Sequence, residues 1–213
     1  MSKEGKQDRD ARLRTFHGGC WGTHHSDMIW LTRELYELSR LRACSSVRRN
    51  ASWVVYAGIP LLVSALQSFV IEYECMFQGD RACLEPLTRG GLTGLVELLE
   101  TRYGVQGKLL EEARGLIEVR NEMVHPVPLP TGTEDDCPTH LRHLKQAGLL
   151  ESTGEATDIP FMTQLASHRL FVWSFRVTRD LFQCVVNSNN EKTGWFQPFV
   201  EQLTSIGFEA NVP

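Results

Sequence analysis

The sequence predicts an all-α fold: a helical bundle around one long buried helix. Apolar residues recur at helical spacing in several segments, whereas no stretch of useful length alternates apolar and polar residues as a half-buried strand would. No internal repeat and no coiled-coil heptad pattern is present. From Asn50 to Ile71 the chain carries no charged residue, which is typical of a helix surrounded by protein on all sides.

The N-terminal part of the chain is expected to form a polar arm followed by two helices. Residues 1–25 are rich in glycine and polar side chains, so we expect a flexible arm there and a single helical domain over 26–213. Ser26 or Asp27 can cap a helix that runs to about Ala43. Its expected apolar contacts are Ile29, Leu31, Leu35, Leu38 and Leu41. A second helix is expected over 50–77, kinked or interrupted at Pro60.

The uncharged stretch of the second helix is also long enough to cross a membrane. Polar residues such as Ser64 and Gln67 interrupt it, and the sequence has no second stretch of this kind. We therefore favour a buried helix in a cytoplasmic protein without a membrane partner, and a membrane span remains the alternative. The charged start of the chain lacks the apolar core of a signal peptide.

The remaining elements are predicted from apolar spacing and from glycine and proline at the boundaries. A connection is expected over Gly79–Pro86, and Gly104 is expected to end the helix that precedes it. Residues 126–138 are rich in proline, glycine and acidic side chains, which predicts a loop. The expected helices span residues 92–103, 108–124, 140–150, 162–187 and 197–206.

Composition argues against several classes of protein. The net charge of −4 and a pI near 6.0 disfavour a protein that coats DNA. The six cysteines are scattered without CxxC pairs, which indicates reduced thiols in the cytoplasm. His17, Cys20, His24 and His25 could together hold zinc, but their spacing matches no familiar zinc finger. We therefore expect neither a metal ion nor another cofactor.

The stretch IEVRNEMVHP, residues 117–126, carries the candidate chemistry. Arg120 shares a helix face with Ala113, Leu116 and Ile117, so a cation lies where an apolar residue is expected. Because Pro126 disfavours the helical conformation for the residue before it, His125 should lie at the helix end. Arg120 and His125 then lie near one helix terminus. They either face a cleft there or only stabilise the helix end, Arg120 as a cation near the negative end of the helix dipole and His125 as a cap.

Arg120, Asn121 and His125 resemble the Rx4-6H signature of the HEPN superfamily, in which asparagine often follows the arginine. Residues 65–69, ALQSF, are similar to the "ALEAF" stretch of several HEPN families, with glutamine in place of glutamate. The resemblance implies a helical bundle that dimerises and brings two Arg–His motifs into one cleft. It also implies a metal-independent endoribonuclease of a bacterial defence or toxin-type system, with RNA as substrate and an antitoxin or effector as a possible partner.

These residue types suit RNA cleavage. A neutral imidazole such as that of His125 can take a proton from a ribose 2′-OH near neutral pH. The guanidinium of Arg120 can bind a phosphate at two points, and Asn121 can orient the pair or the substrate. The expected products are a 2′,3′-cyclic phosphate and a 5′-OH end. The alternatives are an inactive HEPN module that binds nucleic acid, a nucleotide or a protein, and a helical scaffold in which the motif arises by chance.

Three further arginines could contact RNA. Arg169, Arg176 and Arg179 recur on one side of the helix expected over 162–187. They would then line a groove beside the motif and bind phosphates. A solvated helix face explains the same spacing without any ligand.

Overall fold

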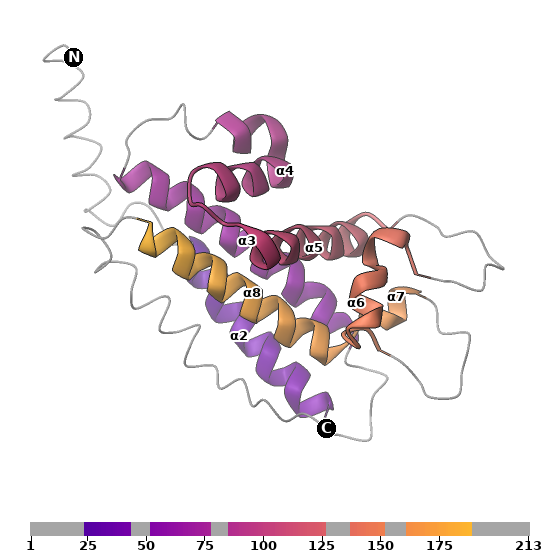
Figure 1. Ribbon diagram of the computed structural model, residues 1–213. Coiled ribbons are helices and arrows are strands. Elements are labelled where there is room, and N and C mark those ends of the chain that lie inside the picture. Colours follow the sequence, from indigo (N-terminus) through magenta and orange to yellow (C-terminus); the bar gives the residue numbers. More distant parts are fainter. Residues whose placement is uncertain (1–23, 44–51, 78–84, 127–136, 152–160, 189–213) are drawn as a thin grey trace, which may run out of the picture.

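A computed structural model describes residues 24–43, 52–77, 85–126, 137–151 and 161–188, and all their regular secondary structure is helical (Figure 1). The elements are α2 (His24–Ala43), α3 (Ser52–Phe77), α4 (Glu85–Thr101), α5 (Gly107–Val124), the 3-10 helix η3 (Thr139–Leu141), α6 (Arg142–Gln146), α7 (Phe161–Gln164) and α8 (His168–Asn187). The predicted all-α class is confirmed, and the HEPN type of bundle stays a prediction. The helix expected over 197–206 and residues 1–23 of the expected arm lie outside the described residues.

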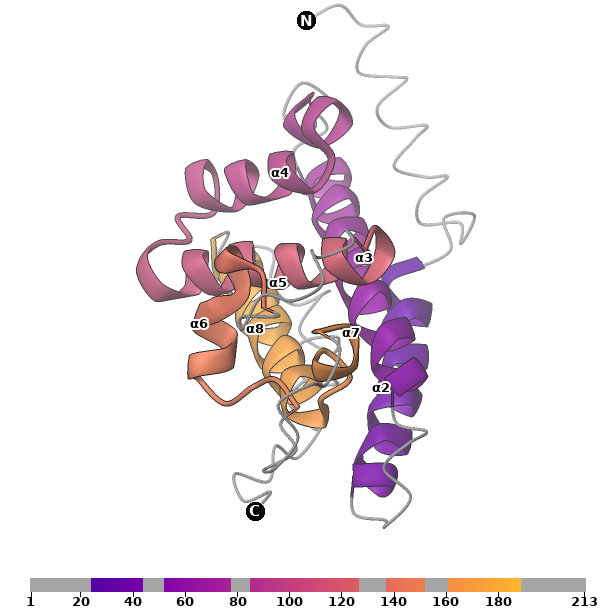
Figure 2. The same ribbon diagram turned by 90° about the vertical axis from the view of Figure 1, so that its right-hand side faces the viewer.

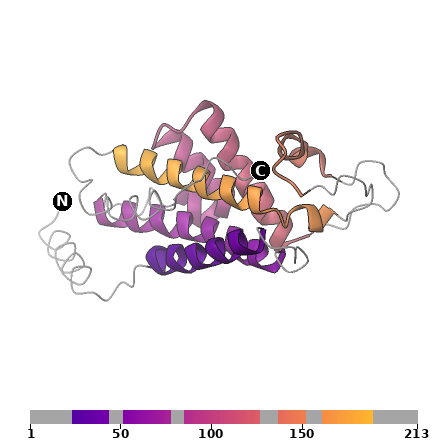
Figure 3. The same cartoon turned by 90° about the horizontal axis from the view of Figure 1, so that it is seen from below.

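The long apolar helix α3 is the centre of the bundle. It packs against α2, α5 and α8, and Figure 3 shows α2, α3 and α8 lying alongside one another. Val54, Leu62, Phe69 and Val70 are among its fully buried side chains. By length and composition the segment Val54–Glu74 could also cross a membrane, but the same features belong to the core helix of a soluble protein. The location of the protein therefore stays a prediction.

Helix α3 runs without a break through Pro60, so of the two expectations for this residue, a kink or an interruption, the interruption is wrong. Two residues earlier, Gly58 is buried where α8 crosses. A Cβ atom at Gly58 would lie 2.2 Å from Cζ of Phe171. The aromatic ring of α8 thus packs directly on the backbone of α3.

The buried face of α2 differs from the predicted one. Leu31 and Leu41 were expected in the core, but their side chains are 54% and 61% exposed. Thr32 and Ser39 are fully buried instead. Both side chains are small and hydrogen-bonded. Thr32 Oγ1 donates to the Met28 carbonyl oxygen, and Ser39 Oγ shares a hydrogen bond with Nδ1 of His168. Small hydroxyls with satisfied hydrogen bonds let α2 approach its neighbours closely, and Leu31 and Leu41 lie outside this contact.

Several further boundaries differ from the prediction. Helix α2 begins at His24, so Ser26 and Asp27 lie inside it and do not cap it, and the helix expected over 140–150 is η3 followed by α6, which ends at Gln146. Helix α4 begins at Glu85, within the expected connection, and changes direction at Gly91, which has φ 54°. The helix expected over 162–187 is divided into α7 and α8. Ser167 caps the second of these, its Oγ accepting a hydrogen bond from the Leu170 N–H at 3.5 Å.

The helix that carries the motif forms as predicted. Gly104 has φ 67° and ends the preceding helix, and α5 follows from Gly107 to Val124. Ala113, Leu116, Ile117 and Val119 bury one face of α5. This face packs α5 against α3 and α8.

Candidate functional site

The candidate motif lies at the C-terminal end of α5. Arg120 is half-buried, whereas Asn121 and His125 are exposed. His125 is the C-cap residue, with φ −131° and ψ 62°, so the prediction that it lies at the helix end is confirmed. Val124, the last residue of α5, is 40% exposed.

Asn121 contacts both other motif residues. Its Oδ1 atom accepts a hydrogen bond of 3.0 Å from Nη1 of Arg120. Its backbone oxygen accepts the N–H of His125 at 2.7 Å. The Arg120 guanidinium makes no ion pair with a carboxylate in the part of the chain that the structure describes. It therefore keeps donors for an anionic ligand.

Helix η3 lies beside this end of α5. Nε2 of His140 is 3.2 Å from Oε1 of Glu122, which joins the two elements across the loop between them. The contact places a second histidine near the motif, and it gives one nearby carboxylate a partner.

The three arginines expected to bind RNA have different surroundings. Arg176 Nη2 bonds Oε1 of Glu112 at 2.6 Å, and Arg179 Nη2 bonds the neighbouring Asp180 at 2.7 Å. Arg169 is exposed, and no carboxylate within the described ranges pairs with it. Their contact with RNA stays a prediction, with Arg169 the most available of the three.

A cavity of about 710 Å³ lies between the first turns of α5, helix α6 and the first half of α8. Arg169 and Arg176 line it, whereas Arg120, Asn121 and His125 do not. The nearest cavity residue on α5 is Glu112, and eight residues of helix separate it from Arg120, or about 12 Å along the axis. The motif and the cavity are therefore separate places on α5.

His168 is a titratable residue that sequence analysis did not single out. It is 7% exposed, lines the cavity, and shares a 2.9 Å hydrogen bond between its Nδ1 and Ser39 Oγ. Its Nε2 is buried and has no partner. Burial lowers its pKa, the charge of Arg40 lowers it further, and Glu37 opposes them. The sequence signal was weak, because His168 is recognisable as buried only once the helix start at Ser167 is known.

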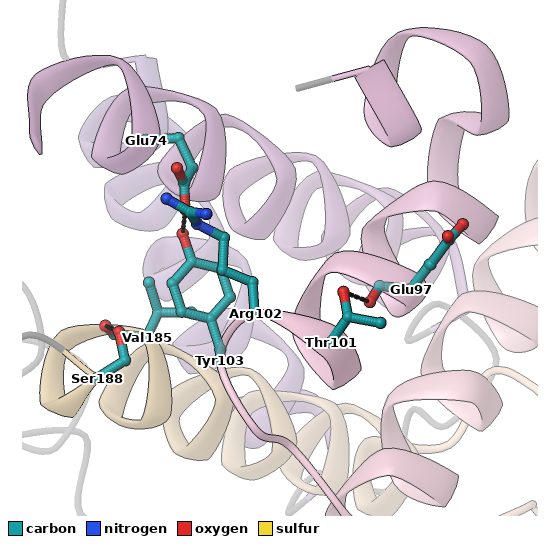
Figure 4. Close-up of polar contacts among 7 residues, drawn as sticks. All are labelled: Glu74, Glu97, Thr101, Arg102, Tyr103, Val185 and Ser188. Carbon is teal, nitrogen blue, oxygen red and sulfur yellow. Dashed lines mark hydrogen bonds and ion pairs between the residues drawn. The ribbon is translucent and has the colours of Figure 1, made fainter. Parts of the chain in front are cut away.

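A second missed group is the buried carboxylate of Glu74, shown in Figure 4. Glu74 is fully buried on α3 and accepts hydrogen bonds from the Tyr103 hydroxyl and, at 2.5 Å, from Nε of Arg102. Burial raises the pKa of Tyr103, and the bond to Glu74 raises it further. Glu74 ties the end of α4 to the end of α3. Its place beside Val70 on the apolar stripe is the signal that sequence analysis could have used.

Within the described residues, no three histidine, cysteine, aspartate or glutamate side chains are grouped closely enough to hold a metal ion. His17 and Cys20 of the possible zinc cluster lie outside those residues, as do the side chains of His24 and His25. No known protein family matches the chain, and no curated protein or solved structure is similar enough to match it.

Proposed function

We propose that this protein is a metal-independent endoribonuclease of HEPN type, acting as a homodimer in a bacterial defence or toxin-type system. Arg120 and His125 are its catalytic residues, and Asn121 is the positioning residue. The observation that carries the proposal is the side-chain hydrogen bond from Arg120 to Asn121 at the helix end where His125 is the exposed C-cap residue.

In the proposed reaction the neutral imidazole of His125 takes the proton of a ribose 2′-OH. The 2′ oxygen then attacks the adjacent phosphorus, while Arg120 binds the phosphate oxygens and stabilises their growing negative charge. The 5′ oxygen of the next nucleotide leaves and takes up a proton. The products are a 2′,3′-cyclic phosphate and a 5′-OH end.

The leaving oxygen needs a proton donor while His125 is acting as the base. A second copy supplies another histidine, so the proposal includes a two-fold dimer with the Val119–His125 regions facing each other. The exposure of Asn121, Val124 and His125 supports an uncovered surface at this end of α5. Gel filtration with light scattering at micromolar concentration tests this, and a monomer under those conditions would contradict the dimer.

The activity is tested by incubating the purified protein with mixed RNA in EDTA. Arg120→Ala and His125→Ala are each expected to lower cleavage by about 10² or more. Arg120→Lys should fail as well, because an ammonium group cannot reproduce the planar two-point grip of a guanidinium. Asn121→Ala should lower kcat more than it raises KM, as expected of a residue that orients the catalytic pair.

Two exposed residues provide matched controls. Arg114 lies on α5 and pairs with Glu100 at 3.1 Å, and His143 lies on α6 in the lining of the separate cavity. Arg114→Ala and His143→Ala should therefore cleave RNA at close to the wild-type rate. Wild-type protein that leaves every RNA intact would overturn the enzymatic proposal, and a non-catalytic binding module would take its place.

A further inference from the structure

The cavity between α5, α6 and α8 has the size of a small-molecule site. Figure 2 shows α6 beside α5 and α8, and the space between the three helices is about 710 Å³. Ligand pockets in proteins commonly measure about 300–1,000 Å³. The cavity lies away from the catalytic motif, so its occupant does not depend on RNA cleavage.

The charges around the cavity favour an anion. Glu112 is already satisfied, since Arg176 Nη2 lies 2.6 Å and Lys108 Nζ 3.8 Å from its Oε1. Glu111 is the other carboxylate at the rim, and Arg169 is a cation without a carboxylate partner in the described ranges. The cavity is thus lined by three cations and two carboxylates, and one of the carboxylates, Glu112, already has two cationic partners.

Part of the cavity wall is apolar and partly aromatic. Trp173 is 7% exposed, and Leu144 and Val172 lie beside it. The wall depends on Gly115, because a Cβ atom there would lie 3.1 Å from His143 Nε2 and 3.7 Å from Trp173 Cη2. The absence of a side chain at Gly115 lets the histidine and the indole lie against α5. Such a wall suits the flat face of an aromatic ring.

A buried polar atom adjoins this wall. His168 lines the cavity and is 7% exposed, and its Nε2 has no hydrogen-bond partner. A buried nitrogen without a partner is unfavourable, but this atom is closed off from solvent, so a bound molecule reaches it only when the neighbouring side chains move. In a neutral imidazole one nitrogen donates and the other accepts, and the Ser39 hydroxyl at Nδ1 can do either, so this bond leaves both roles open to Nε2.

We propose that this cavity binds a small organic anion with an aromatic body. The acidic group lies near Arg169 and Arg176, and the ring lies against Trp173. The shared chemistry is an aromatic carboxylate or an aromatic phosphate ester, since both present oxygens that a guanidinium binds at two points.

Isothermal titration calorimetry with the full chain tests the proposal. The probes are 2-naphthoate, 2-naphthyl phosphate, the neutral 2-naphthol, and ring-free acetate and inorganic phosphate. One or both aromatic anions are expected to bind at least tenfold more tightly than the neutral or ring-free compounds, and the stronger of them identifies the acidic group. Equal binding of 2-naphthol, or no binding of either aromatic anion at millimolar concentration, would overturn the proposal.

Variants locate the site. Arg169→Ala is expected to raise Kd about tenfold or more, while Arg142→Ala removes the same charge from α6 outside the cavity and should leave Kd unchanged. Val172→Phe places a ring in the cavity and should also weaken binding. Thermal melting confirms that each variant is folded, and Arg169 is exposed, so its loss should not unfold α8. An unchanged Kd in folded Arg169→Ala would show that the anion binds elsewhere.

Discussion

Replacing Gly58 by alanine tests how closely α8 packs on α3. Glycine inside a helix is ordinarily unfavourable, and an alanine there gains about 1 kcal/mol of helix stability. At Gly58 the new Cβ atom would lie 2.2 Å from Cζ and 2.8 Å from both Cε atoms of Phe171. Ordinary van der Waals contact begins at 3.4 Å, so the ring would have to move by more than 1 Å.

Phe171 has little freedom to move. It is fully buried, and its ring centroid lies 5.8 Å from that of Tyr36 and 5.2 Å from that of Phe175. Overpacking of a core of this kind costs about 1–3 kcal/mol, and the deep overlap places Gly58→Ala near the upper value. After the helix gain is subtracted, the free energy of unfolding should fall by about 2 kcal/mol. In a chain of this length the Tm should fall by about 4–8 °C.

Urea unfolding followed by far-UV circular dichroism measures the change. Gly90→Ala is the matched control, since Gly90 is exposed in α4 and nothing lies within 4 Å of its added Cβ atom. That variant should be unchanged or more stable by up to about 1 kcal/mol. Phe171→Leu should cost less in the Gly58→Ala background than alone, with a coupling energy of about 1–2 kcal/mol. A Gly58→Ala protein that is as stable as wild type would refute the packing argument.

Three other predictions concern buried polar groups and the central helix. Tyr103→Phe removes a hydrogen-bond donor from the buried carboxylate of Glu74 and should lower the free energy of unfolding in urea by about 1.5–3 kcal/mol. Tyr56→Phe removes a hydrogen bond to the neutral Met162 carbonyl and should lower it by about 1 kcal/mol. A larger loss in Tyr56→Phe than in Tyr103→Phe would contradict the reasoning. The lowered pKa of folded His168 means that the unfolded chain binds more protons below pH 6.5, so stability should fall as pH falls through 6.5 and level off below the folded pKa. His168→Gln should remove this part of the pH dependence, and an identical slope in the variant would exclude His168 as its source. If Val54–Glu74 is a core helix, the untagged protein should be in the soluble fraction after lysis. Protein that stays in the membrane fraction after carbonate washing would show a membrane span instead.

The sequence by itself predicted the elements whose boundaries depend on local chemistry. Helical spacing of apolar residues predicted α3 and α5, and the left-handed conformation of Gly104 separates α4 from α5 as expected. His125 ends α5 because the ring of Pro126 restricts the backbone of the residue before it. These effects act within a few residues, so they can be read without knowledge of the neighbouring helices.

The tertiary structure decided which faces and which polar groups are buried. Leu31 is exposed and Ser39 is buried because the position of α8 brings His168 to Ser39, 129 residues further along the chain. Glu74 likewise finds Tyr103 through contact between α3 and the end of α4. The cavity exists only where α5, α6 and α8 meet, and no pattern within any one of them predicts it. Burial and pairing depend on contacts between segments far apart in the sequence, whereas helical periodicity describes one segment at a time.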